Sequence, residues 1–94
     1  MDERQNKFTV IISGADKVGI VAKVTNVLAG QRVNIENIKQ TLLQGHFVMF
    51  LLVDITNSNS SFNQIEKSLF SVGREFDVDV RIQEKQNSDN ISVF

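Results

Sequence analysis

The 94-residue sequence contains no cysteine, which excludes disulfides, thiolate nucleophiles and cysteine-ligated zinc sites. This absence fits a reducing cytoplasm. The segment Met1–Lys7 has mixed charge and no apolar stretch, so no signal peptide is predicted. The longest apolar run, Phe47–Val53, is far too short to cross a membrane. We therefore expect a small cytoplasmic protein that spans no membrane.

Two other absences limit the possible partners. Ten lysine and arginine residues against 11 acidic residues give a net charge of −1, so no overall field attracts nucleic acid or an anionic membrane. The sequence has no tyrosine or tryptophan, and Phe47 and Phe50 fall on opposite faces of one predicted strand. An RNA-recognition domain needs aromatic residues on one open sheet face, so this class is not favoured.

The first half of the chain predicts a strand, a helix and a second strand. Apolar and polar residues alternate over residues 8–12, as in a strand with one buried face. A helix is predicted from about residue 18, and Gly30 is expected to end it as a left-handed cap. Its apolar stripe consists of Ile20, Val21, Val24, Val27 and Leu28. The second strand begins at Val33, and a shift in its alternation predicts a bulge at Glu36-Asn37.

The third predicted strand, residues 46–55, follows a turn at Gln44-Gly45 and is apolar on both faces. Such a strand belongs in the middle of a sheet. Because two helices can cover only one face, we expect the other face, with Val48, Phe50 and Leu52, to meet a second copy. Whether dimers pair again through this face to form a tetramer stays open.

The second half predicts a helix and an edge strand. Ser61 and Gln64 form a capping-box signature before an apolar stripe that runs from Phe62 to Phe76. Residues 77–83 alternate, with Asp77 and Asp79 on a solvent-facing side. Residues 1–6 are predicted to be a disordered terminus and residues 84–94 a polar tail. The order βαββαβ predicts an α+β, ferredoxin-like sandwich with a four-stranded antiparallel sheet and both helices on one face.

The junction at Ser13–Val21 is the strongest candidate for a binding site. A strand that turns through glycine into a helix leaves free backbone N–H groups for a carboxylate or a phosphate. The spacing Gly14-x-x-x-x-Gly19 resembles a phosphate loop, but Ile20 and Val21 follow where that loop has lysine and serine or threonine. An acylphosphatase-like hydrolase needs an arginine here, and the only cation is Lys17, so this alternative is weak.

The sequence assembles no catalytic group. His46, the only histidine, lies at a predicted hairpin turn and is interpreted as a solvated turn residue. Asp77 and Asp79 could touch one cation, but an exposed strand face explains them better. No nucleophile, base and oxyanion site come together. We therefore predict that the protein is not an enzyme and has no metal or cofactor.

Two motifs carry a family resemblance: Asp16-Lys17-Val18-Gly19-Ile20-Val21, and Val33-Asn34-Ile35-Glu36-Asn37-Ile38. With the order of elements, they make residues 7–83 resemble an ACT domain, in particular the small stand-alone ACT proteins. The resemblance implies a non-enzymatic regulatory module that senses a small molecule, mostly an amino acid, between two copies and signals to a partner protein. Residues 84–94 depart from what the stand-alone proteins have at this point.

The resemblance also implies the site residues. The backbone of Val18, Gly19, Ile20 and Val21 would hold the ligand, and Asp16 and Lys17 would set loop geometry or charge preference. Asn34 and Ile35 would reach the ligand from the partner subunit. The alternatives are that Gly19 serves only the turn, that Asn34 only bonds in a turn before its strand, and that the chain is a ligand-free dimerisation module.

Overall fold

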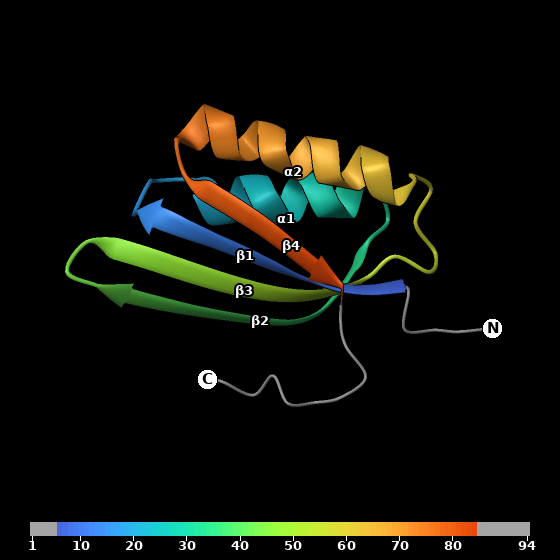
Figure 1. Ribbon diagram of the computed structural model, residues 1–94, viewed down its shortest axis with the longest axis horizontal. Helices are drawn as coiled ribbons and strands as arrows, with labels where there is room; N and C mark the ends of the chain where they lie inside the picture. Colours follow the sequence, from blue (N-terminus) through green and yellow to red (C-terminus); the bar gives the residue numbers. More distant parts are fainter. Residues whose placement is uncertain (1–5, 85–94) are drawn as a thin grey trace.

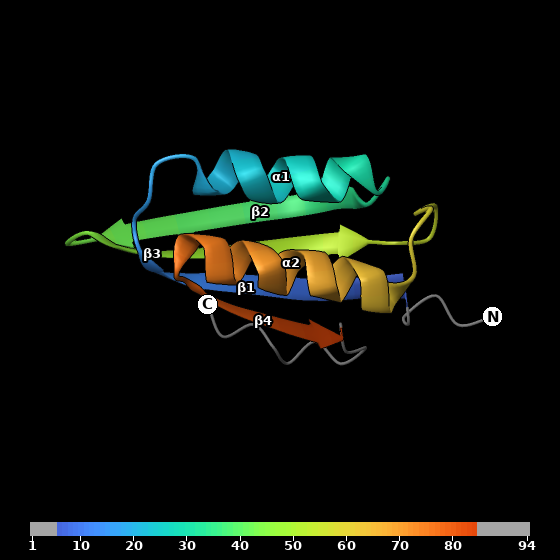
Figure 2. The same ribbon diagram turned by 90° about the horizontal axis from the view of Figure 1, so that it is seen from above.

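The computed structural model describes residues 6–84, which form a four-stranded sheet with two helices on one face (Figure 1). The elements are β1 (Lys7–Ala15), α1 (Ile20–Gly30), β2 (Asn34–Leu43), β3 (His46–Asp54), α2 (Phe62–Phe76) and β4 (Asp79–Glu84). The strand order is β2-β3-β1-β4, and every neighbouring pair is antiparallel (Figure 2). The predicted ferredoxin-like βαββαβ sandwich is confirmed.

The predicted bounds of the domain, residues 7–83, stay a prediction. The predicted disordered terminus, residues 1–6, and the predicted tail, residues 84–94, lie outside the described residues except for Asn6 and Glu84. The carbonyl of Asn6 accepts a hydrogen bond from the Ile55 N–H at 2.8 Å, and Glu84 pairs with Phe8 as the last residue of β4.

The core lies between the sheet and the helices. Alternate residues of β3 are buried on the helix side, while Val48, Phe50 and Leu52 are half-buried on the opposite side. The buried core consists of Val10, Ile12, Ile20, Val24, Leu28, Val33, Phe47, Met49, Leu51, Val53, Ile65, Leu69 and Val72. The stripes of both helices and the alternation of both central strands were therefore predicted correctly. We call the side of the sheet away from the helices the open face.

Pairing with β3 makes β1 longer than its apolar alternation predicts. Ser13, Gly14 and Ala15 continue the ladder with β3, so the loop before α1 is confined to Asp16–Gly19 and α1 begins at Ile20 instead of near Val18. The Cβ-free Gly14 allows this continuation, because a Cβ there would lie 3.0 Å from a side-chain carbon of Val78. A small residue thus lets β1 pass beneath the α2–β4 connection.

The β2–β3 hairpin follows the predicted turn and bulge. Gln44 and Gly45 both have positive φ, 55° and 79°, as a two-residue turn that matches the strand twist requires. The register shifts between Ile35 and Asn37, which leaves Glu36 as the extra residue of a bulge. The predicted bulge is confirmed.

The end of α1 differs from the prediction. Gly30 is the last helical residue, and the left-handed residue is Arg32, with φ of 60°. The Arg32 N–H donates to the Ala29 carbonyl at 3.0 Å, and the Val33 N–H donates to the Leu28 carbonyl at 3.0 Å. These two bonds are those of a Schellman ending, which places the left-handed position two residues after the last helical residue. The predicted cap at Gly30 is therefore wrong by two positions.

The two ends of α2 have different caps. The capping box is confirmed, because the Gln64 N–H donates to Ser61 Oγ at 3.2 Å and the Ser61 N–H donates to Gln64 Oε1 at 2.8 Å. At the other end, Asp77 has left-handed φ and ψ of 57° and 50° and is the C-cap of α2. The prediction that Asp77 lies in a strand is wrong, since β4 begins at Asp79 after this reversal.

Candidate functional site

The start of α1 leaves its first backbone N–H groups without a side-chain acceptor. Gly19, the N-cap, has φ of 89° and ψ of −3°, and no side chain caps the helix. The first turn also contains no acidic residue. Because the first N–H groups of a helix have no partner within it, they can bind an anionic group together with the positive end of the helix dipole. The start of α1 therefore has no side-chain cap at the position where the sequence predicts an anion site, and the site itself stays a prediction.

Two hydrogen bonds hold the Asp16–Gly19 loop against neighbouring elements. The Asp16 N–H donates to the Gly45 carbonyl at 3.0 Å, so the loop lies beside the β2–β3 hairpin. The Lys17 ammonium donates to the Phe76 carbonyl at 2.8 Å, at the C-terminal end of α2. This bond satisfies a terminal helix carbonyl and places a cation at the negative end of the helix dipole. Lys17 is the only cation of the loop, so an acylphosphatase-like hydrolase would need it to bind phosphate. Its ammonium is instead bonded to the Phe76 carbonyl, which counts against that alternative.

The predicted loop residues differ in what they can offer a ligand. Val18 is 99% exposed and Gly19 is exposed, whereas the Ile20 side chain is 2% exposed and belongs to the core. Val21 is half-buried against the core. Ile20 can therefore contribute only its backbone to a ligand, and Val18 is the apolar side chain that faces solvent next to the helix start.

The structure places Asn34 and Ile35 at the opposite end of the sheet from the loop. Asn34 pairs with Asp54, which also pairs with Lys7 at the start of β1, whereas Ala15 at the end of β1 pairs with His46. Nine strand residues at about 3.3 Å each separate these ends by roughly 25–30 Å. Gly19 and Asn34 therefore cannot contact one small ligand within a single chain.

The part of the predicted site formed by Asn34 and Ile35 has polar surroundings. Asn34 is exposed, and Ile35 is half-buried with its β3 partner Val53 in the core. The Thr56 hydroxyl and N–H donate to the neighbouring Asp54 carboxylate at 2.6 and 2.9 Å and hold its pKa below the ordinary value of 3.8. This end of the sheet consequently carries an ionised carboxylate beside an exposed amide at neutral pH.

An exposed apolar surface that the sequence analysis missed lies along β2. Leu42 is 58% exposed, Leu43 68% and Ile38 40%. We call these three residues the β2 edge patch; Ile38 and Leu42 lie on the helix side of the strand, and Leu43 lies on the opposite side. Val18 belongs to the loop that the Asp16–Gly45 bond joins to the hairpin. A consecutive apolar pair before a turn, Leu42-Leu43, is the sequence signal that could have indicated it.

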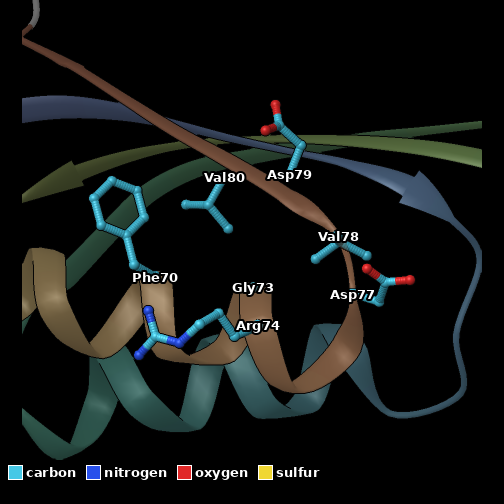
Figure 3. Close-up of a pocket in the computed structure, with 7 residues that line it drawn as sticks. All are labelled: Phe70, Gly73, Arg74, Asp77, Val78, Asp79 and Val80. Atoms are coloured by element: carbon cyan, nitrogen blue, oxygen red, sulfur yellow. The ribbon is translucent and has the colours of Figure 1, made fainter.

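Two hollows in the described surface are lined by none of the predicted site residues. One, of about 340 Å³, lies between α2 and β4, where Val78 and Val80 point toward the helix and Arg74 and Asp77 lie at its edge (Figure 3). The other, of about 410 Å³, lies between α1 and α2 and is bordered by Lys23. Within residues 6–84 no three acidic or histidine side chains cluster as metal ligands, and neither helix is long and apolar enough to span a membrane.

Comparison with known proteins agrees with this architecture. A family model described as an ACT domain matches residues 7–83. A UPF0237 protein of Clostridium acetobutylicum is 37% identical over 79 residues, which are 84% of this chain and 89% of that protein. An ACT domain protein of Streptococcus pneumoniae superimposes with a TM-score of 0.70 at 31% identity, covering 82% of this chain and 86% of that chain.

The same fold also occurs inside a longer protein. A formyltetrahydrofolate deformylase of Pseudomonas syringae pv. tomato superimposes with a TM-score of 0.75 at 28% identity. The match covers 82% of this chain but only 26% of that one. The similarity there is to one part of the enzyme. The family model and the relatives of similar length together show that this chain belongs to the ACT domain family.

Proposed function

We propose that the chain is a non-enzymatic regulatory module of the cytoplasm. In this proposal it binds an amino acid between two copies of itself and passes that state to a partner protein. The observation that carries the proposal is the uncapped start of α1 at Gly19, beside the exposed Val18. The ACT regulatory fold supports the regulatory part of the proposal.

The ligand's carboxylate would bind the first N–H groups of α1. Gly19 has no side chain, so a ligand can approach the backbone closely, and nothing lies within 4 Å of the position a Cβ would take. The Val21 N–H would supply a donor, whereas the Ile20 N–H already donates to the Lys17 carbonyl at 3.3 Å. Lys17, bonded to Phe76, and Asp16, bonded to Gly45, would keep the loop in place.

A two-fold dimer through β2 would complete the site. β2 is an edge strand, and a long exposed edge with apolar side chains favours pairing with another chain. If two β2 strands pair antiparallel, the Asn34 end of one lies beside the Leu43 end of the other. The Asp16–Gly45 bond places the Asp16–Gly19 loop at that second end. Asn34 and the backbone of Ile35 from the partner would then approach the loop from across the interface.

The β2 edge patch also supports the alternative of a dimerisation module without a ligand. In either case the output would pass through another protein, and the presence of a similar module within a longer enzyme of Pseudomonas syringae pv. tomato supports such coupling. A ligand that binds one dimer arrangement ~100-fold better than another would bias it by ~2.7 kcal/mol. This is enough to change a partner's state measurably.

Thermal unfolding against the twenty amino acids tests the proposal. At a ligand concentration 100 times its Kd, stabilisation of ~2.7 kcal/mol raises the Tm of a domain this small by roughly 10 °C or more. Asn34→Ala should abolish a selective shift. Asn37→Ala is the matched control, because Asn37 is an exposed amide on the same strand, and it should retain the shift.

A second pair of variants tests the loop. Gly19→Ala and Gly45→Ala place a Cβ at similar positive φ, 89° and 79°, with nothing within 4 Å in either case. Both should lower Tm similarly through backbone strain, but only Gly19→Ala should lose the ligand shift. No shift with any amino acid, in a protein that sediments as a dimer, would favour the ligand-free module. A monomer without a shift would contradict both forms of the proposal.

A further inference from the structure

We infer that two copies of this chain pair their β2 strands antiparallel, with the two-fold axis at Gln40. This register rests on the proposed dimer and makes it specific, because it states which residues of the two edges lie opposite one another. Three features support it: the exposure of the two sheet edges, the length of the regular part of β2, and the order of apolar and charged residues along that strand.

The two edge strands of the sheet differ in what they expose. On β4 the apolar residues Val80 and Ile82 pair with core residues of β1 and are half-buried. The exposed positions of β4 carry Asp79, Arg81, Gln83 and Glu84. Charged side chains on an edge strand oppose its pairing with another strand. On β2 every residue from Asn37 to Leu43 is exposed, and three of them are apolar. β2 is therefore the edge that a second strand can cover.

Two exposed apolar residues of β2 lie on the helix side of the sheet. Ile38 and Leu42 pair with Leu51 and Phe47 of the core, so their side chains point to the side that carries the helices. They are nevertheless 40% and 58% exposed. The hairpin end of β2 extends beyond the start of α1 (Figure 2). Within residues 6–84 no element buries these two side chains, whereas a strand beside β2 would cover both.

The part of β2 that can pair regularly runs from Asn37 to Leu43. Glu36 is the extra residue of the bulge, and Gln44 begins the hairpin turn with positive φ. A bulge disrupts the ladder and bends its strand, which limits regular pairing on that side. Gln40 is the central residue of the segment between these limits. An antiparallel pair centred on Gln40 therefore uses the whole segment of both strands, and any other centre uses less of it.

In this register the exposed apolar residues of the helix side meet each other. Ile38 lies opposite the partner's Leu42, and by symmetry Leu42 lies opposite the partner's Ile38. Opposite residues of an antiparallel pair point to the same side of the sheet, with Cβ atoms about 4.5–5.5 Å apart. Gln40 lies opposite its own copy between these two apolar pairs. Its amide can both donate to and accept from the symmetry-related amide.

Charge and pattern disfavour the neighbouring registers. Because opposite residues share one side of the sheet, the axis must lie at a residue. An axis at Lys39 would place two ammonium groups directly opposite, and like charges in this position are destabilising. An axis at Thr41 would place Leu42 opposite the partner's Gln40 and would leave Ile38 outside the paired segment. The axis at Gln40 is the one that matches the two apolar residues.

The same register aligns the two parts of the proposed ligand site. Counting along the paired strands, with Glu36 as the extra residue, brings Asn34 level with the partner's Gly45. In each chain the Gly45 carbonyl accepts the Asp16 N–H and so holds the loop before α1 beside the hairpin. The end of β2 that carries Asn34 would then lie next to the loop of the other chain, as the proposed function requires.

Single cysteines test the register, because the chain has no cysteine of its own. Gln40→Cys places a thiol opposite its own copy, at a Cα–Cα separation of about 4.5–5.5 Å that a disulfide can bridge. Lys39→Cys and Thr41→Cys are the matched controls, because both positions are exposed on the same strand. Each lies about 7–8 Å from its own copy, beyond disulfide reach. Under mild oxidation Gln40→Cys should form a disulfide dimer at least about ten times faster than either control.

A mixture of the two controls should behave differently from either alone. Residue 39 of one chain lies opposite residue 41 of the other, so an equimolar mixture of Lys39→Cys and Thr41→Cys should form the mixed disulfide readily. Mass spectrometry identifies this product, since the two chains differ in mass. Lys39→Cys also removes the repulsion that disfavours an axis at residue 39, so it tests that register under favourable conditions.

The outcomes separate the register from the dimer. Fast oxidation of Gln40→Cys and of the mixture, but of neither control alone, supports the inference. Faster oxidation of Lys39→Cys or Thr41→Cys alone overturns the register and leaves the proposed dimer through β2 intact. Equal rates for all three variants overturn the register as well. A protein that sediments as a dimer but forms none of these disulfides overturns it and assigns the dimer to another surface. A monomer overturns both the register and the proposed dimer.

A second measurement compares neighbouring leucines. Leu42→Asn removes an apolar partner, and two-fold symmetry counts the loss twice, so the dimer Kd should rise at least about ten-fold. Leu43→Asn is the matched control, because Leu43 lies on the open face, opposite the partner's Asn37 in this register. Its Kd should change less than about three-fold. Sedimentation equilibrium measures both values, and an equal or larger effect of Leu43→Asn contradicts the inference.

Discussion

Gly73 is where α2 and β4 approach too closely for any side chain. A Cβ at this position would lie 2.9 Å from Val80 Cγ2 and 3.0 Å from the Val78 carbonyl oxygen. The second contact is with backbone, and the Val78 N–H is bound to the Gly73 carbonyl at 2.9 Å, so neither segment can move away without losing a hydrogen bond. Gly73→Ala should therefore overpack the α2–β4 contact, at a cost of about 2–3 kcal/mol in the free energy of unfolding.

The helix preference of alanine offsets part of this cost, by about 1 kcal/mol. The net loss for Gly73→Ala is then about 1–2 kcal/mol, or a fall in Tm of roughly 4–15 °C. Gly30→Ala is the matched control, because Gly30 is also helical and no atom lies within 4 Å of its Cβ position. It should be neutral or should raise stability by up to about 1 kcal/mol. Denaturant unfolding measures the change in the free energy of unfolding for both variants. If Gly73→Ala is as stable as the unsubstituted protein or more stable, the steric reasoning is refuted.

Three further changes test the helix ends and the far end of the sheet. Ser61→Ala removes one half of the capping box and should reduce stability by about 1 kcal/mol, whereas Ser71→Ala within α2 should not; equal effects would contradict the role of the cap. Arg32→Gly relieves a left-handed residue and should stabilise by about 1 kcal/mol, and a loss of thermal stability would contradict this. Thr56→Val should raise the Asp54 pKa, because the hydrogen bond from the Thr56 hydroxyl to the carboxylate is the largest cause of its lowered value. That carboxylate's small contribution to stability is complete above its unfolded pKa of about 4 and is lost as the pH falls through the lowered folded pKa. Carboxyl NMR titration measures the change, and an unaltered pKa would contradict the assignment.

The fold could be predicted because its signals are local and repeated. The stripe from Phe62 to Phe76 and the alternation along β3 depend only on which residues face the core. The bulge at Glu36 was visible as a slip in that alternation. The errors occur where tertiary pairing decides a boundary: β1 extends to Ala15 because β3 provides partners there, and the Schellman ending selects Arg32 although Gly30 is the intrinsically favoured residue.

The sequence predicts where the candidate site lies, which stays a prediction, but it does not predict the contacts that the loop makes. A glycine between a strand and a helix indicates where anion-binding N–H groups collect. The bond from Lys17 to Phe76 joins residues far apart in sequence, and no local pattern encodes it. The β2 edge patch was missed because the exposure of Leu42 depends on how much of β2 the helices cover, which sequence alternation does not report.

The separation of Gly19 from Asn34 along one sheet determines the stoichiometry of any ligand that needs both. Such a ligand binds only where two chains meet, so each two-fold dimer holds two equivalent sites and an isolated chain holds half of each. Ligand binding and self-association are then linked by mass action: saturating ligand tightens the dimer, and dilution of the protein weakens ligand binding. A sensor of the proposed kind would therefore respond to the concentration of its own chain as well as to that of its ligand.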